Sequence, residues 1–272
     1  MTFSRLGGGY VLQKCLPHFG QTQNWSGVHG LSGVGSFISI CAPHRWQRMW
    51  RPISLMPASY PSSTCRKIVA VIPAVILAAG KSTRMGRPKA TLPLGGATFL
   101  GTIVRSFQEA GVDDVVVVLG YEAASIEESL RQEGVTARLV VNEGYESGQL
   151  SSLLTGLRAV DRPGVRAILL SLVDVPLVSA STIRSVLERY RKTGARVVRP
   201  VRGLDHGHPV LIDRTLFDEL RAADPAVGAK PVVRAHTSAE GDVEVSDEGS
   251  FLDIDTPEDY ARLVQVSGDP RG

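Results

Sequence analysis

The chain has 272 residues, of which 43% are hydrophobic, so it can bury the core of one large α/β domain or two small ones. Its formal net charge of +3 is unevenly distributed, because residues 1–70 hold seven basic side chains and no acidic one, which leaves 23 basic and 27 acidic side chains in residues 71–272. This acidic excess, together with the absence of an apolar run of the roughly 18 residues that span a bilayer, leads us to expect no nucleic-acid partner and no membrane partner.

Residues 1–70 differ from the rest of the chain in composition and in pattern. They contain all three cysteines and all three tryptophans, and they show no sustained period of 2 or 3.6. We expect an N-terminal extension with little stable structure, which is either a weak match to a transit peptide or the product of a start codon placed too far upstream. The absence of cysteine from residues 71–272 fits a reducing, cytoplasmic location.

From residue 74 onward, short apolar strands alternate with amphipathic helices. The pattern predicts strands at 74–79, 114–119, 137–141, 167–172, 196–201, 208–212 and 243–246, and helices at 98–110, 122–132, 148–160, 179–192, 213–223, 228–236 and 256–264. Such alternation is typical of a mostly parallel sheet with helices on both faces. Ligands of open parallel sheets bind beyond the carboxyl ends of the strands, so we expect the loops after Ala79, Val141 and Leu172 to line one crevice.

The loop after the first strand combines small residues with cations. The small residues are Ala78, Ala79 and Gly80, and the cations that follow are Lys81, Arg84, Arg87 and Lys89. Small residues let backbone N–H groups approach an anion, and cations offset the negative charge of a triphosphate. The spacing fits neither a Walker loop nor the G-x-G-x-x-G of a dinucleotide fold. The loop therefore predicts a phosphate site, with a surface turn of solvated cations as the alternative.

Two later segments bring carboxylates to the same crevice. An apolar strand ends at Asp174, two residues before Pro176. Mg²⁺ takes few carboxylates together with phosphate oxygens, so Asp174 suits a metal ligand. Asp253 and Asp255 alternate along an extended segment and point to opposite sides, so only one of them can face the metal, and we choose Asp255. Capping of the last helix is the competing role for Asp255.

These segments together resemble the MobA-like NTP-transferase family, most closely its molybdenum cofactor cytidylyltransferase branch. Residues 77–89 read L-A-A-G-K-S-T-R-M-G-R-P-K and are followed by L-P-L at 92–94, similar to the family signature L-A-A-G-x-S-x-R-M-G-x-x-K-x-L-L-P. Residues 174–176 are similar to its D-x-P motif, and residues 252–260 to its closing L-D-I-D-T-P-E-D-Y. The resemblance implies a three-layer Rossmann-like nucleotide-diphospho-sugar transferase fold of the GT-A type, with residues 71–272 as the nucleotidyltransferase domain.

The resemblance also implies roles for individual residues. The nucleotide would be bound by Leu77, Ala78, Ala79, Gly80, Lys81, Arg84, Lys89, Ser151 and Ser152. Lys89, Arg84 and Asp174 would be catalytic, and Asp174 and Asp255 would hold Mg²⁺. The acceptor would meet Gly207, His208 and Pro209 of the G-H-P-V segment. The alternative for the two serines is that Ser147 caps the helix and Gly156 allows its close packing, without a ligand role for Ser151 or Ser152. His208 could be catalytic, could bind the acceptor's phosphate, or could only order its loop.

We therefore expect transfer of CMP from CTP to the phosphate of molybdopterin, with release of pyrophosphate. The L-A-A-G at residues 77–80 favours CTP, because guanylyl-transferring relatives usually show L-A-G-G. Attack by the acceptor's own phosphate needs positioning and charge neutralisation more than a protein nucleophile. Three alternatives are the use of GTP or another phosphorylated acceptor such as a sugar phosphate, a non-catalytic nucleotide-binding protein that hands cofactor to a molybdoenzyme, and a nicotinamide-dependent oxidoreductase, which the missing dinucleotide loop disfavours.

Overall fold

The computed structural model describes residues 71–267, and within them the main sheet has the strand order β10-β7-β9-β6-β1-β4-β5. Its strands are β1 (Ala74–Ala78), β4 (Val115–Leu119), β5 (Arg138–Val141), β6 (Ala167–Leu172), β7 (Val197–Arg202), β9 (Val210–Asp213) and β10 (Asp242–Glu244), and β8 (Asp205–His206) pairs with β7 off this path. The expectation of an N-terminal extension at residues 1–70 lies outside the described residues.

The strand pairing confirms the predicted mostly parallel sheet. Strand β1 runs parallel to β4 and β6, β4 runs parallel to β5, and β10 runs parallel to β7. Strand β9 is antiparallel to both β6 and β7. The chain returns from β7 to β9 through a short connection that contains β8, which is too short for the crossover that a parallel pair needs.

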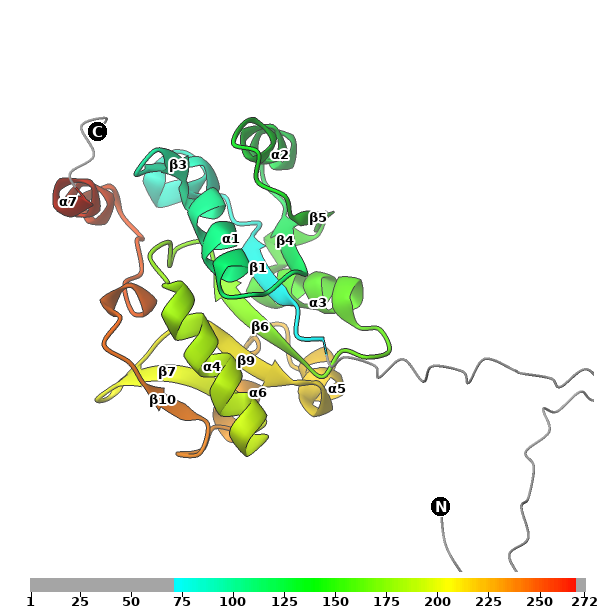
Figure 1. Cartoon of the computed structure of the whole chain (residues 1–272). Coiled ribbons are helices and arrows are strands. Elements are labelled where there is room, and N and C mark those ends of the chain that lie inside the picture. The colour runs from blue at the N-terminus through cyan, green and yellow to red at the C-terminus, as the bar shows by residue number, and fades with distance from the viewer. Residues whose placement is uncertain (1–70, 268–272) are drawn as a thin grey trace, which may run out of the picture. The chain divides into compact units, whose positions relative to one another are not determined.

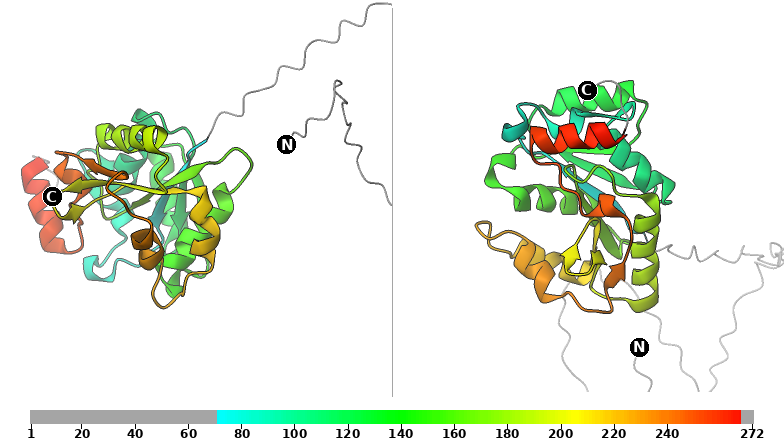
Figure 2. Two further views of the ribbon diagram at one scale, coloured as in Figure 1. Left: turned by 90° about the horizontal axis from the view of Figure 1, so that it is seen from below. Right: turned by 90° about the vertical axis from the view of Figure 1, so that its left-hand side faces the viewer.

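Helices cover both faces of the sheet, as Figures 1 and 2 show. The helices α1 (Phe99–Glu109), α2 (Ala123–Gln132) and α4 (Ala180–Thr193) share one apolar cluster with the sheet, and α3 (Gln149–Val160), α5 (Phe217–Arg221) and α6 (Lys230–Ala235) share another. In α3 the residues Leu150, Leu153 and Leu157 recur three and four positions apart, so they form one buried stripe. This is the predicted three-layer arrangement. No helix of residues 71–267 combines the length and the apolarity needed to cross a bilayer.

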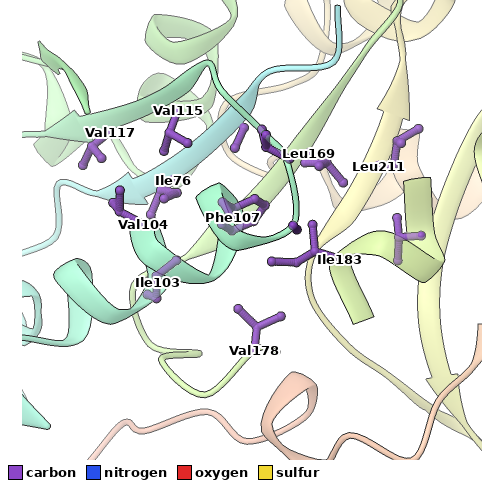
Figure 3. Close-up of a cluster of buried hydrophobic side chains, with 14 of the residues drawn as sticks. Ile76, Ile103, Val104, Phe107, Val115, Val117, Leu169, Val178, Ile183 and Leu211 are labelled. Carbon is purple, nitrogen blue, oxygen red and sulfur yellow. The ribbon is translucent and has the colours of Figure 1, made fainter. Parts of the chain in front are cut away.

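The larger apolar cluster lies between the sheet and the pair α1 and α4 (Figure 3). Ile76 and Leu169 of the sheet are fully buried there with Phe107 of α1 and Ile183 of α4. All five residues of β1 are buried because both of its faces are covered, which explains its uninterrupted apolar sequence. The cluster makes β1 and β6 a rigid support for the loops that follow them.

The end of the chain returns to the carboxyl ends of the central strands. A small hairpin of β2 (Pro93–Leu94) and β3 (Ala97–Thr98) packs with α7 (Pro257–Ser267) in a third apolar cluster that contains Ile254. The Tyr260 hydroxyl donates a hydrogen bond to the Pro93 carbonyl (2.9 Å), and the Ile254 N–H donates to the Asp174 carbonyl (2.8 Å). The segment with Asp253 and Asp255 is thereby fixed beside Asp174.

Candidate active site

The loop after β1 is closed by its own hydrogen bonds. Ser82 has a left-handed backbone (φ 50°), and its hydroxyl accepts a hydrogen bond from the Lys89 N–H (3.1 Å). Gly86 is also left-handed (φ 68°), a conformation that glycine adopts without steric cost. A serine at positive φ is uncommon in proteins and is held there by the surrounding turns. The closed loop therefore places Lys89 near the carboxyl end of β1.

A cavity of about 320 Å³ lies at the carboxyl ends of the strands, between three loops. It is lined by Leu77, Ala79, Gly80, Ser82 and Lys89 from the first loop, by Tyr145, Gly148, Gln149 and Ser152 from the second, and by Leu172, Val173 and Asp174 from the third. This confirms the expectation that the loops after Ala79, Val141 and Leu172 share one crevice. We call this space the small cavity.

Lys89 is the loop cation that reaches the small cavity. Its side chain is 10% exposed, and its ammonium group lies 2.5 Å from the Asp255 carboxylate. Arg84 approaches the other oxygen of that carboxylate at 3.8 Å, and its side chain is 73% exposed. Asp255 thus faces the cations of the first loop and lines neither this cavity nor the larger one described below.

The remaining cations of the loop point elsewhere. Lys81 pairs with Glu146 of the second loop (2.5 Å) and lies 5.9 Å from the centre of the Tyr145 ring. Arg87 lies over the Tyr260 ring of α7, also at 5.9 Å. Lys81 therefore connects the first loop to the second, and Arg87 connects the first loop to the C-terminal helix.

Asp174 is a buried acceptor that lacks a donor. Its Oδ1 is buried and has no hydrogen-bond partner within residues 71–267. Burial raises the pKa of Asp174 to about 6; Lys89 opposes this increase, and the charges of Asp253 and Asp255 add to it. An unpaired buried carboxylate oxygen is costly, so this position suits a bound cation.

Asn142 organises the second loop, a role that the sequence did not reveal. Its buried side-chain amide donates to the hydroxyls of Ser151 (2.9 Å) and Ser152 (3.0 Å), and its Oδ1 accepts from the Gly144 N–H (3.1 Å). The Ser151 hydroxyl donates to the Gly148 carbonyl (2.8 Å). Ser152 therefore lines the small cavity. Ser151 does not line it and is instead hydrogen-bonded to the loop that precedes α3.

A second cavity of about 920 Å³ adjoins the first. Its lining includes Gly207 and His208 of the predicted acceptor segment, but Pro209 is buried outside it. Asp174 lines both cavities, as do Gln149 and Leu172. We call this space the large cavity. A ligand in one cavity and a ligand in the other would meet at Asp174.

The G-H-P-V segment is fixed against the chain's last loop. A Cβ at Gly207 would lie 2.4 Å from the Ser250 carbonyl oxygen, so only glycine allows this close approach. The His208 N–H donates to the same carbonyl (2.8 Å), and its Nδ1 lies 3.4 Å from the Leu170 carbonyl. Because a carbonyl only accepts, Nδ1 carries the proton. Burial lowers the pKa of His208, so the imidazole is neutral at neutral pH.

The donor set fits a metal that substrate phosphates help to coordinate. Within residues 71–267 no group of three or more His, Cys, Asp or Glu side chains could hold a metal ion unaided. Asp174 and Asp253 line the large cavity, and Asp255 is engaged by Lys89. Mg²⁺ commonly binds through one or two carboxylates and completes its shell with phosphate oxygens and water.

Comparisons with known proteins identify the family. The model of the MobA-like NTP transferase domain matches residues 74–240. Nicotine blue oxidoreductase from Paenarthrobacter nicotinovorans is 32% identical over 197 residues, covering 70% of this chain and 95% of that protein. A probable molybdenum cofactor guanylyltransferase from Mycolicibacterium paratuberculosis is 31% identical over 195 residues, covering 71% and 94%.

Solved structures agree with this result. The manganese complex of Rv0371C from Mycobacterium tuberculosis H37Rv is 31% identical, with a TM-score of 0.55, and the match covers 72% of this chain and 98% of that one. Solved nucleotidyltransferases share the Rossmann-like nucleotide-sugar transferase fold, as predicted. The chain belongs to the MobA-like NTP transferase family and is a nucleotidyltransferase.

Proposed function

We propose that this nucleotidyltransferase transfers CMP from CTP to the phosphate of molybdopterin and releases pyrophosphate. The observation that carries the proposal is the meeting of two cavities at Asp174, with Lys89 in the small cavity. The small cavity takes the nucleotide and the large cavity the acceptor. CTP is favoured by L-A-A-G at residues 77–80, where guanylyl-transferring relatives usually have L-A-G-G.

Binding of the triphosphate exchanges one partner of Lys89 for another. The Lys89 ammonium group donates to the Asp255 carboxylate at 2.5 Å. A phosphate oxygen in the small cavity competes for the same ammonium group and offsets its charge equally well. Lys89 and the more exposed Arg84 then stabilise the negative charge that develops as pyrophosphate leaves. The backbone of residues 77–80, Lys81 and the serines of α3 complete the proposed nucleotide site.

Mg²⁺ is the proposed cofactor, held by Asp174 with Asp255 as the second carboxylate. The unpaired Oδ1 of Asp174 and the raised pKa of its carboxyl group support a cation at this position. When bound, the ion neutralises phosphate oxygens and orients them. Asp174 has to be ionised to bind it, so protons should compete with Mg²⁺ and weaken its binding as the pH falls below about 6.

The acceptor is oriented by the G-H-P-V segment on the wall of the large cavity. His208 is neutral, so it contributes a hydrogen bond at Nε2 rather than a positive charge. The acceptor's phosphate supplies the attacking oxygen, and the nucleotide's α-phosphorus loses its bond to the pyrophosphate. The protein positions these two groups at the junction of the cavities.

Purified protein would be incubated with Mg²⁺, each of the four nucleoside triphosphates, and either molybdopterin or a sugar phosphate, while pyrophosphate is measured. We expect the highest kcat/KM with CTP and molybdopterin. A preference for GTP would bring the chain into line with its guanylyltransferase relative, and a preference for the sugar phosphate would reassign the acceptor. Calorimetric binding of CTP without turnover would instead indicate a carrier that hands cofactor to a molybdoenzyme.

The name of the oxidoreductase relative calls for one further control. Reduced nicotinamide cofactors would be added without CTP, and their oxidation followed at 340 nm. We expect no binding and no oxidation, because the first loop lacks the glycine spacing of a dinucleotide fold. A cytoplasmic location is part of the proposal and is supported by the absence of cysteine from residues 71–272.

A further inference from the structure

One wall of the large cavity carries two cations that have no partner. Lys230 and Arg234 both line the cavity, and they stand four residues apart on α6, which puts them on the same face of the helix. Both residues are exposed, and neither side chain makes a hydrogen bond or an ion pair within residues 71–267. Like charges at this spacing repel each other, so the pair is unfavourable until an anion binds.

Among the other charged groups that line the cavity, Arg199 and Asp205 have partners of opposite charge. Arg199 is neutralised by Asp242 at 2.8 Å. The charges of both Asp253 and Lys230 act on His208, whose pKa the first raises and the second lowers. His208 therefore lies within electrostatic reach of Asp253 and of Lys230.

The two cations are separate from the proposed position of the reacting phosphates. Both line the large cavity only, whereas the residues shared with the small cavity are Gln149, Leu172 and Asp174. An acceptor phosphate that attacks the nucleotide has to reach this shared end. Lys230 and Arg234 do not line this shared end, so in the proposed reaction they would meet another part of the acceptor.

We propose that Lys230 and Arg234 form a subsite for a second anionic group on the acceptor, distinct from the phosphate that reacts. This inference rests on the proposed function, because the large cavity is the acceptor's only in a transfer reaction. It narrows the acceptor class to phosphorylated molecules with another anionic group at a distance from the reacting phosphate. An acceptor with one phosphate and an otherwise neutral body lacks a partner for these cations.

The kinetic test uses the full chain with Lys230→Gln, Arg234→Gln and the double variant. Lys192→Gln is the matched control, because Lys192 is also an exposed, unpaired cation but lies on α4 at the opposite face of the sheet. We expect the acceptor's KM to rise about fivefold in each single variant and about thirtyfold in the double variant, because each lost contact is a charge-assisted hydrogen bond. The kcat and the KM for CTP stay within about twofold of wild type, the pattern of a uniform binding contact.

Three kinetic outcomes would overturn the subsite. An unchanged acceptor KM in the double variant would show that the two cations are only solvated surface charges. A parallel rise in the KM for CTP would assign them to the triphosphate. A large fall in kcat would assign them to the reacting phosphate. Unfolding temperatures of all variants are compared with wild type, and the Lys192→Gln control measures the effect of charge removal alone.

A second measurement separates this inference from the proposed function. Crystals of wild type and of the double variant would be soaked with sodium tungstate, a heavy tetrahedral dianion, without nucleotide or acceptor. We expect an anomalous peak between the two side chains in wild type and none in the double variant. Tungstate elsewhere only, or nowhere, contradicts the subsite even if CMP transfer is found. A bound tungstate without any transfer to molybdopterin contradicts the acceptor assignment but keeps the subsite.

Discussion

The two cavities are built in different ways, although they meet at one carboxylate. The small cavity draws five of its lining residues from a single loop, between Leu77 and Lys89. The large cavity is assembled from β6, β7, β8, β9, α6 and the last loop, which are distant in sequence. A phosphate group is nearly the same in every nucleotide, so one local loop can serve it. An acceptor varies between enzymes, and its site is spread over segments that can change independently.

Lys89→Ala should separate the two cavities most clearly, because Lys89 is a cation that lines the small cavity. We expect kcat to fall by about three orders of magnitude, because the transition-state charge loses its buried partner. Lys192→Ala, the removal of a remote exposed lysine, should leave kcat unchanged. Pyrophosphate release and the unfolding temperature are measured together. A variant with normal turnover would show that the first loop does not neutralise the leaving group.

Asp174→Asn tests the point where the two cavities meet, and both the activity and the stability of the variant are measured. We expect the variant to lose turnover, because an amide is a poor metal ligand. The folded pKa of about 6 lies above the ordinary 3.8, so the folded carboxyl group holds its proton more tightly than the unfolded one. The wild type therefore loses stability as the pH rises from about 4 to about 6, by about 2 to 3 kcal/mol.

The asparagine variant carries no titrating group at this position and escapes that loss. Urea unfolding in EDTA should show it about 2 kcal/mol more stable than wild type at pH 8 and equal to wild type at pH 4. Added Mg²⁺ and CTP should stabilise the wild type only. A stability difference that is the same at both pH values would contradict the burial of an ionisable carboxyl group at residue 174.

Gly207→Ala acts first on the wall of the large cavity. The added Cβ meets the Ser250 carbonyl at 2.4 Å, so the last loop has to shift, at a cost of about 2 kcal/mol. The acceptor's KM should rise more than the KM for CTP. Gly144→Ala, whose nearest contact would be 3.6 Å, is the control expected to fold normally. An equal rise in both KM values would mean that the two cavities are coupled through their shared residues.

Asn142→Ala gives the mildest effect and acts on the small cavity. It removes hydrogen bonds to both serines and to the Gly144 N–H. Of these three bonds only the one to Ser152 positions a residue that lines the cavity, so we expect the KM for CTP to rise about fivefold, the effect of one net hydrogen bond of about 1 kcal/mol, and the acceptor's KM to stay constant. Ser151→Ala should change less than Ser152→Ala, because only Ser152 lines the cavity. A larger effect of Ser151→Ala than of Ser152→Ala would instead indicate that Ser151 contacts the nucleotide.

Most of the fold could be predicted from the sequence because strand and helix periodicity is a local property. The antiparallel direction of β9, the β2–β3 hairpin and strand β8 were not predicted, since they depend on short segments with weak patterns. The helix expected at residues 213–223 is divided into a 3-10 turn (Arg214–Leu216) and α5, after Asp213 accepts a hydrogen bond from the Thr215 N–H (2.8 Å).

The site was predictable where its residues are neighbours in sequence. Alternation correctly indicated that Asp253 and Asp255 point to opposite sides: one lines the large cavity and the other meets Lys89. The choice of Asp255 as metal ligand stays a prediction. The sequence did not single out Lys230 and Arg234, because only tertiary packing decides which face of α6 borders a cavity.

The pairing of Lys89 with Asp255 joins residues that are 166 positions apart, and the Ile254 N–H secures the same segment to Asp174. A nascent chain therefore cannot assemble this centre until residues 253–255 have been made. Fragments that end before residue 253 would retain the central strands but leave the lysine without its counter-ion.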